Sequence, residues 1–400
     1  MIRCALLAWL LAACADDAVP GFTRETAPDG RGIVSYAAGL PMHEDTLVAL
    51  FSVGKYVDDS SRIFNDLRDL DVGPDGRIYA LDYGASNITV FDSVGTQLAV
   101  LGRPGEGPGE LSQANGLRFG PDGTLWVNDH GKGMILALDT AGLERKRYLG
   151  LVPGFGYRWS VTIDTAGVLW ESWSQRIAGP PPDMSKNGVV EGSSYRMFKT
   201  FDPATEVRDS VVLDRTTGRG YVASYGRGQW STGLPFAGRA YGALDQRHRV
   251  WVSSPDAYTL VRMNAVSGDT TLEVAVAESG VPVTAADIAE WKESLADIAK
   301  DVPSIVTDLK AYLPDSMPPI DGLFADDRDR LWIERTVPAG DPLRWDLFTP
   351  EGEFLTTIRG PAGISGGLEP VVRRGRIYLV VNGDAGERYI VVAELPGVLR

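Results

Sequence analysis

The stretch from Leu101 to Asp129, LGRPGEGPGELSQANGLRFGPDGTLWVND, contains the pattern that decides the fold. In its second half a Gly-Pro-Asp-Gly turn is followed by an aliphatic residue and then an aromatic one, at the start of a short apolar run. Proline presets φ and glycine accepts a positive φ, so these residues favour a tight turn between two antiparallel strands.

The aliphatic–aromatic pair at the start of this strand occurs six times. Three of the five steps between copies are 44 to 47 residues long, and the other two are 81. A repeat of this length, built from four antiparallel strands, is typical of a propeller blade, and the long steps indicate insertions. A β-sandwich would explain the turns but not six copies of one aromatic position. The pairs are Ile78-Tyr79, Leu125-Trp126, Leu169-Trp170, Val250-Trp251, Leu331-Trp332 and Ile377-Tyr378.

The first two copies, Leu67 to Asp92 and Leu101 to Asp129, resemble the NHL repeat and related six-bladed propeller proteins. The features that carry the resemblance in Leu101 to Asp129 are a G-x-G-x-G-x-[FL] linker, a P-D-G turn and an [IL]-[YW]-V-x-D strand. The resemblance covers residues 45–396, but the last four copies keep only the aliphatic–aromatic strand. It implies an all-β, six-bladed β-propeller. Since the last copy offers only three strands, we expect Thr46 to Val53 to close it as the fourth.

The N-terminal residues predict an exported lipoprotein. Residues 1–13 begin with a positive charge and contain an apolar run too short to span a membrane, which is typical of a signal peptide. The run ends in LAAC, which resembles the bacterial lipobox and implies a lipid on Cys14; an ordinary secretory cleavage site followed by a chance cysteine is the alternative. Ala15 favours the outer membrane.

After cleavage Cys14 is the only cysteine, so no intramolecular disulfide is expected. We expect residues 14–45 to carry the lipid and form a flexible tether, and residues 46–400 to form the propeller. The net charge of −14 and the pI near 4.8 argue against a nucleic-acid partner, so we expect membrane contact through the lipid alone and a monomer.

Three long segments fall on connections that share one face of a propeller, namely 171–194, 214–239 and 278–321. We expect the first two to be loops and the third to contain a helical insertion at about 282–313. There Thr284 and Asp287 resemble a capping box, and apolar residues recur at helical spacing. The helix is either a mobile lid or a structural cap.

The same face is rich in aromatic and arginine side chains, which suit the stacking and forked hydrogen bonds of peptide, protein or glycan ligands. We therefore expect a non-enzymatic binding or scaffold module without a cofactor. The alternative is that these side chains only cover the blade tops. The candidate binding residues on this distal face are Arg158, Trp159, Arg176, Tyr225 and Trp230.

A second candidate site is the mouth of the central channel. Asp82 and Asp129 end equivalent strands, and the matching or adjacent positions of other repeats add His130, Trp173, Arg335 and Asn382. Two carboxylates could hold Ca²⁺, and some six-bladed lactonases and related hydrolases use a channel metal, so a metal-dependent hydrolase is the alternative function. Pairing of the two aspartates with Arg335 or with backbone amides is the structural alternative. No catalytic residue is assigned.

Overall fold

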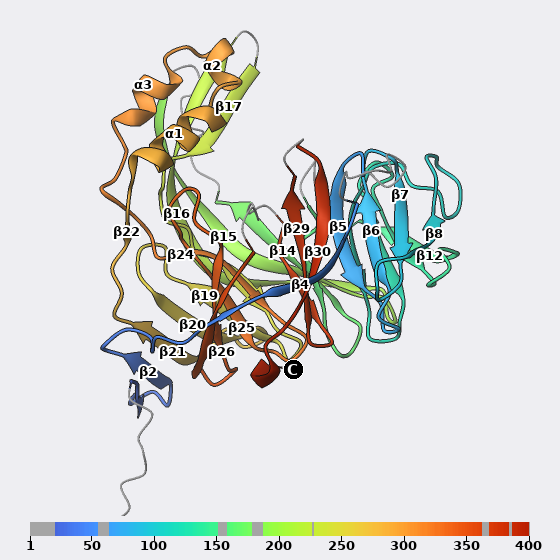
Figure 1. The fold of residues 1–400 in the computed structure, drawn as a ribbon, viewed down its shortest axis with the longest axis horizontal. Helices are drawn as coiled ribbons and strands as arrows, with labels where there is room; N and C mark the ends of the chain where they lie inside the picture. The colour runs from blue at the N-terminus through green and yellow to red at the C-terminus, as the bar shows by residue number, and fades with distance from the viewer. Residues whose placement is uncertain are drawn as a thin grey trace, which may run out of the picture.

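The computed structural model describes residues 21–54, 64–150, 158–177, 187–225, 228–361, 368–383 and 386–399. Most of these residues belong to strands, which form six sheets of four to six strands and one two-stranded ribbon, an architecture of the β-propeller type (Figure 1). The signal peptide and Cys14 lie outside the described residues. Within the ranges above, no helix has the length and hydrophobicity needed to cross a membrane.

Each copy of the repeat forms one sheet, with its strands in chain order. The first sheet contains β5 (Leu67–Val72), β6 (Ile78–Asp82), β7 (Asn87–Phe91) and β8 (Gln97–Leu101). The second contains β9 (Ala114–Phe119), β10 (Leu125–Asp129), β11 (Met134–Leu138) and β12 (Glu144–Leu149). The third contains β13 (Val161–Ile163), β14 (Leu169–Arg176), β15 (Gly188–Asp202), β16 (Val207–Tyr225) and β17 (Gly228–Gly233).

The remaining three sheets follow the same plan. The fourth contains β18 (Gly242–Leu244), β19 (Arg249–Ser253), β20 (Thr259–Asn264) and β21 (Thr270–Val276). The fifth contains β24 (Ile320–Ala325), β25 (Leu331–Arg335), β26 (Arg344–Phe348) and β27 (Phe354–Arg359). The sixth contains β28 (Val371–Arg373), β29 (Arg376–Asn382) and β30 (Arg388–Glu394), and a short 3₁₀ turn (Gly397–Leu399) ends the described chain.

The backbone explains why the turn before each aromatic strand recurs. In every repeat the residue two positions before the aliphatic anchor has a positive φ, which glycine adopts without strain. His248 and Asp329 adopt it as well, both with φ of 61°. The six residues are Gly76, Gly123, Gly167, His248, Asp329 and Gly375.

The middle repeats keep the backbone hydrogen bonds of this turn, but an aspartate takes its first position in place of the glycine that precedes P-D-G. The Oδ1 atoms of Asp164, Asp245 and Asp326 each accept backbone N–H bonds from the residues two and four positions later, at 2.8–3.0 Å. An aspartate that bonds its own backbone fixes such a turn. The hairpin is therefore retained although the motif that identified it in the first two repeats is lost.

A flexible tether was predicted for residues 14–45, but the described part of this segment, from Gly21 onward, contains strands. From Thr23 onward it forms β1 (Thr23–Thr26), β2 (Gly32–Tyr36), β3 (Glu44–Thr46) and β4 (Val48–Val53). Strand β2 pairs with β21 and β3 with β27, both in parallel, and β4 pairs with β30 in antiparallel fashion. These three strands cover the outer edges of the fourth, fifth and sixth sheets, which would otherwise present unpaired backbone groups.

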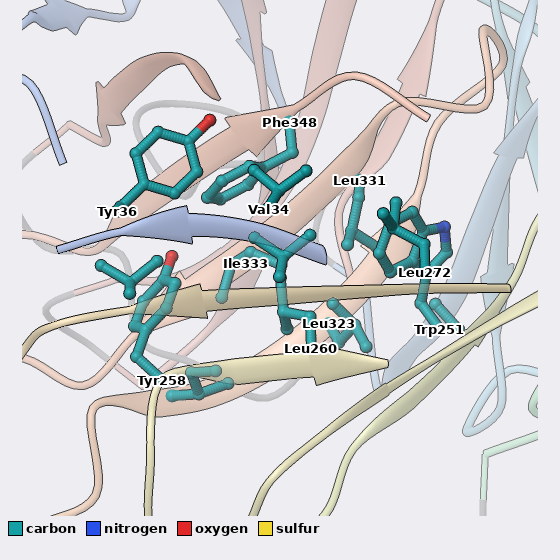
Figure 2. Close-up of a cluster of buried hydrophobic side chains, with 14 residues drawn as sticks. Val34, Tyr36, Trp251, Tyr258, Leu260, Leu272, Leu323, Leu331, Ile333 and Phe348 are labelled. Carbon is teal, nitrogen blue, oxygen red and sulfur yellow. The ribbon is translucent and has the colours of Figure 1, made fainter. Parts of the chain in front are cut away.

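Side chains on β2 bind two sheets together, which also explains why this segment is ordered. Val34 and Tyr36 are buried among apolar residues of the fourth and fifth sheets (Figure 2). The Tyr36 hydroxyl accepts a hydrogen bond from the Phe354 N–H at 2.6 Å and donates one to the Gly352 carbonyl at 3.2 Å. Burial of two large side chains contributes about 1.5–3 kcal/mol each, which outweighs the intrinsic flexibility of a polar segment.

The long insertions form a separate module at one end of the molecule, with β2 at the opposite end (Figure 1). Segments 171–194 and 214–239, expected as loops, are in large part strands, because β14, β15 and β16 extend beyond the sheet and β17 adds a further hairpin. The third segment contains α1 (Ala285–Ser294), α2 (Ile298–Asp301) and α3 (Ile305–Lys310), between β22 (Val281–Pro282) and β23 (Ser316–Met317).

Candidate functional site

The first strands of all six sheets line one inner cavity of about 170 Å³. Its walls come from β5, β9, β13, β18, β24 and β28, so it occupies the place of the central channel of a propeller. The cavity is small, because side chains from these strands fill most of the space between them. It can hold water but not a sizeable ligand.

Charges in the inner cavity are paired with one another. The fully buried carboxylate of Asp69 accepts hydrogen bonds from Arg118 Nη1 at 2.8 Å, from Arg158 Nη2 at 2.6 Å and from the Leu117 N–H at 3.0 Å. Burial alone would raise the pKa of Asp69, but the two guanidinium groups hold it below its usual value. Asp71 likewise accepts the Phe119 N–H at 2.8 Å.

Two residues predicted for the distal face therefore lie inside the molecule. Arg158 is held against Asp69 in the inner cavity, 89 positions away in the chain. Trp159 is only 2% exposed and packs in an apolar cluster with Trp126 and Ile135. These two predictions are wrong because an arginine–aromatic pair has the same appearance in sequence whether it binds a ligand or a distant strand.

The two aspartates of the predicted channel mouth act as loop anchors. Asp82 accepts backbone N–H bonds from Asn65 at 2.8 Å, Asp66 at 3.0 Å and Ala85 at 3.0 Å. The side chains of Asp82 and Asp129 are both buried, and each of their carboxylate oxygens accepts at least one backbone N–H bond.

Asp129 repeats this arrangement in the next sheet, where Ser112 and Gln113 donate at 2.8 and 3.0 Å and Lys132 N at 3.3 Å. Each aspartate thus ties the linker that enters a sheet to the turn after the second strand. Of the structural alternatives, the pairing is with backbone amides and not with Arg335. The described residues contain no group of three or more His, Cys, Asp or Glu side chains arranged to hold a metal.

The other channel-mouth candidates have separate partners. Arg335 forms ion pairs with Glu278 and, at 3.4 Å, with Asp346. Trp173 lies beneath the ammonium group of Lys199 at 5.2 Å. His130 is half-buried in the turn between β10 and β11, and Asn382 is exposed at the end of β29. Nothing in the described contacts joins these residues into one ring.

Two glutamates near the inner strands have altered acidity that the sequence did not reveal. Burial raises the pKa of Glu171 on β14 to about 7, and it raises the pKa of Glu334 on β25 to about 7, helped by the negative charge of Asp321. Glu334 packs over Gly322 of the neighbouring strand, where a side chain would crowd it at about 3.0 Å. The sequence signal that could have indicated these raised pKa values is a glutamate that follows apolar residues within a predicted strand.

The insertion module has its own apolar core. Tyr221 and Ala223 of β16 pack against Leu295, Ile305 and Leu309 of the helical segment. The Tyr221 hydroxyl also donates a 2.6 Å hydrogen bond to Asp308. The helices therefore cover the extended part of the third sheet, which favours a structural cap over a mobile lid.

The local signals that defined α1 are confirmed. Thr284 Oγ1 accepts the Asp287 N–H at 3.2 Å, and Asp287 Oδ2 accepts the Thr284 N–H at 2.6 Å, which completes the predicted capping box. Tyr225 and Trp230, predicted as distal-face binding residues, are half-buried against these helices and serve packing.

A wide cleft lies between the module and the fourth and fifth sheets. Its volume is about 1770 Å³, and it is bounded by the upper parts of β15 and β16, the end of β17, and segments 234–241 and 312–321. Polar and apolar surface contribute about equally to its lining, which includes many glycine, serine and threonine residues. Of the predicted binding residues, the structure brings Arg176 to this cleft, where it is exposed.

Five arginines and four acidic side chains are among the described residues that line the cleft, in an otherwise acidic protein. Arg196 pairs with Asp214, and the Arg219 guanidinium lies 5.8 Å from the Tyr312 ring and 3.9 Å from Glu191. Arg215 donates to Ser193 Oγ at 3.3 Å. The Arg176 guanidinium is exposed at the cleft, and its side chain makes no ion pair or hydrogen bond with another described residue.

No protein-family model matches the chain, and no curated protein sequence does. Among solved structures it is similar to a DUF4221 family member from Bacteroides vulgatus, at 11% identity and a TM-score of 0.46, over 87% of this chain and 97% of that one. It is also similar to a gluconolactonase from Xanthomonas campestris, at 13% identity and a TM-score of 0.40, over 86% and 98%.

A third similar structure is virginiamycin B lyase from Staphylococcus aureus, at 12% identity and a TM-score of 0.37, over 83% of this chain and 85% of that one. All three are β-propeller-type proteins. At such identities and scores the activities of these proteins do not transfer to the chain.

Proposed function

We propose that the chain is a binding module whose cleft holds an extended polar chain, either a peptide segment or a glycan strand. The observation that carries the proposal is the cleft itself. Its volume of about 1770 Å³ exceeds the roughly 300–1,000 Å³ of ordinary small-molecule sites. Forked guanidinium donors, hydroxyl groups and glycine backbone along its walls suit a ligand that presents many carbonyl, carboxylate or hydroxyl oxygens.

The proposal includes a six-bladed ring, related to NHL-type propellers, that β4 closes. Two observations support it: all six first strands line one cavity, and β4 pairs with the last strand of the sixth sheet. A closed ring holds the first strands rigidly, so that the third and fourth sheets present the cleft walls at a constant separation. Such a scaffold suits a monomeric binder, since the ligand need not order the site.

The proposal also includes export and a lipid anchor at Cys14, with the outer membrane as the expected location. Cys14 lies only seven positions before the first described residue, Gly21. The nearby strand β2 and the insertion module lie at opposite ends of the molecule (Figure 1). An anchor at Cys14 would therefore leave the cleft facing away from the membrane, toward a partner.

The test uses a soluble chain that starts at Ala15 and so contains every described residue. This chain is applied to arrays of peptides and of envelope glycans, and the best ligands are measured by calorimetry. The double variant Arg176→Glu/Arg215→Glu should weaken binding at least tenfold, because it reverses two exposed charges on the cleft wall.

The matched control is Arg77→Glu/Arg145→Glu, which reverses two exposed charges outside the cleft and should change the affinity less than about twofold. Absence of any ligand on both arrays would overturn the proposal. So would a ligand whose affinity falls equally in both double variants, because it would bind by overall charge alone.

A further inference from the structure

A smaller pocket of about 400 Å³ opens beside the cleft, beneath helix α1. We call it the α1 pocket. Its lining comes from one face of α1, from segment 236–241, from residues 317–321 and from residues 336–339 after β25. Phe236, Arg239, Tyr241 and Asp321 line both the pocket and the cleft, so the two spaces are continuous.

The walls of the α1 pocket are aromatic and apolar. Phe236, Tyr241 and Trp291 are each half-buried and contribute to its lining, and Met317 and Ile320 are buried beside them. Three aromatic side chains line this one cavity, and the faces of aromatic rings carry negative electrostatic potential. Such walls attract a cationic group more strongly than a neutral one.

Acidic side chains outnumber basic ones at the pocket. Asp321 and Glu290 are exposed there, and Arg239 is the one basic residue among its described lining. The Tyr241 hydroxyl donates a 2.9 Å hydrogen bond to Asp321, which fixes the carboxylate beside the aromatic wall. The remaining acidic residue, Asp287, is already bonded within the α1 cap.

The loop between the two spaces is held in one conformation. Phe236 has a φ of 53°, a left-handed conformation that is uncommon for an aromatic residue. Gly238 passes so close to Pro255 that a Cβ would lie 1.9 Å from the Pro255 carbonyl oxygen. Strained positions of this kind persist only where the surroundings enforce them, and they mark sites in which a side chain must stay in place.

Asp287 fixes the opposite wall. Its Oδ1 accepts the Ala339 N–H at 2.6 Å, while its Oδ2 accepts from Thr284. One carboxylate thereby joins the start of α1 to the segment that forms the far side of the pocket. The pocket is therefore built before any ligand arrives, which lowers the conformational entropy lost on binding.

We propose that the α1 pocket binds the ammonium or guanidinium end of a basic side chain, a lysine or an arginine of a bound peptide. The aromatic rings would contact the cation and its alkyl stem, and Asp321 and Glu290 would supply the opposite charge. The part of the inference that names a peptide rests on the proposed function of the cleft, whereas binding of the cation alone does not.

The test titrates ¹⁵N-labelled chain starting at Ala15 with Nα-acetyl-lysine methylamide and Nα-acetyl-arginine methylamide, following the indole N–H signals by NMR. Nα-acetyl-norleucine methylamide is the neutral control of similar shape. At least one cationic probe should bind about tenfold more tightly than norleucine and should shift the Trp291 signal, which Trp291→Phe identifies.

Three substitutions sharpen the test while the melting temperature reports folding. The affinity for the cationic probe should fall several-fold in Asp321→Asn and in Glu290→Gln, because each substitution removes a negative charge from the pocket. The affinity should rise in Arg239→Gln, because this substitution removes a positive charge. Asp256→Asn, in the cleft but outside the pocket, is the matched control and should have no effect. Both carboxylate positions are exposed, so these variants should fold.

Equal binding of the norleucine and cationic probes would overturn the inference, and so would a Trp291 signal that no probe shifts. The two proposals fail separately. Cationic probes that bind while no peptide or glycan does would remove the proposed function and leave the pocket. An array ligand that depends on Arg176 and Arg215, without any effect of the probes, would remove the pocket alone.

Discussion

The first two sheets and the insertion module are stabilised by contacts of different range. In the sheets β5–β8 and β9–β12, strands of five or six residues pack through positions that recur with the repeat, such as Ile78 and Leu125. In the module, the β16 residues Tyr221 and Ala223 pack against helices that follow some 70–90 positions later. Local repeats therefore set the scaffold, and long-range contacts set the cleft.

This contrast has a functional consequence. Contacts between distant segments form late in folding, because a long loop must close first. The cleft and the α1 pocket both use the module as a wall, so the proposed binding surfaces depend on contacts of this kind and can be tested separately from the repeats. The following experiments test that division.

The largest effect is expected where the scaffold depends on a buried charge. Asp69→Ala would leave the guanidinium groups of Arg118 and Arg158 without their carboxylate in the inner cavity. We expect the free energy of unfolding to fall by about 3–5 kcal/mol, measured by urea denaturation. The control Asp122→Ala, in an exposed turn, should cost less than about 1 kcal/mol. A loss of similar size in both variants would show that the Asp69 cluster has no special role.

The next effect separates the module from the scaffold. Leu309→Ala removes a fully buried side chain from the module core and should cost about 3 kcal/mol there. Hydrogen exchange should become faster in α1, α3 and β17 but stay unchanged in β5–β12. Leu136→Ala, in the second sheet, is the counterpart and should accelerate exchange across the scaffold. Uniform acceleration by Leu309→Ala would contradict a separate module.

A third effect depends on pH. Burial in the folded state raises the pKa of Glu334 from about 4.5 to about 7, so this carboxyl group ionises less readily in the folded protein than in the unfolded chain. Stability should therefore fall as pH rises from about 4.5 through about 7. Glu334→Gln removes the ionisable group and with it this dependence on pH. The free energy of unfolding of the variant, relative to that of the parent protein, should therefore grow by about 2 kcal/mol between pH 5 and pH 8. The control Gln97→Asn, at an exposed position without an ionisable side chain, should give a difference that does not vary with pH.

A smaller effect concerns the repeated turn. Gly123 has a φ of 82°, and a Cβ there would meet nothing closer than 3.7 Å. Gly123→Ala should therefore cost about 1 kcal/mol through backbone strain alone, measured by denaturation. Gly192, in the cleft wall, has open space and no positive φ, so Gly192→Ala is the control and should be close to neutral. An equal loss of stability in the two variants would show that the positive φ of Gly123 is not the cause.

The smallest effect is an expected absence of change. Because the oxygens of Asp82 and Asp129 already accept backbone N–H bonds, we expect excess Ca²⁺ and EDTA to give the same melting temperature, measured by calorimetry. A ligand present at a hundred times its dissociation constant would stabilise the folded state by about 2.7 kcal/mol. A melting temperature that rises with Ca²⁺ in the parent protein but not in Asp129→Ala would instead support the metal-dependent hydrolase.

The candidate site was only partly predictable from sequence. Arg176 was predicted for the distal face, because the long segments fall on connections that share that face, and the structure places it at the cleft. Tyr225 and Trp230 were expected there too, but their partners are helices 60 or more positions later in the chain, and only the folded structure reveals them. Phe236, Asp321 and Trp291 gather in one pocket from three separate segments, so no spacing in the sequence identifies them together.

The sequence by itself determined the features that depend on neighbouring residues: the short strands, the turns with a positive φ, and the capping box of α1. These follow from backbone preferences that act within a few positions. Only the tertiary structure decided that a polar N-terminal segment becomes the outer strands of two sheets, and that Asp69 pairs with Arg158. Those outcomes depend on which distant groups lose water together, a property of the assembled core and not of any single stretch of chain.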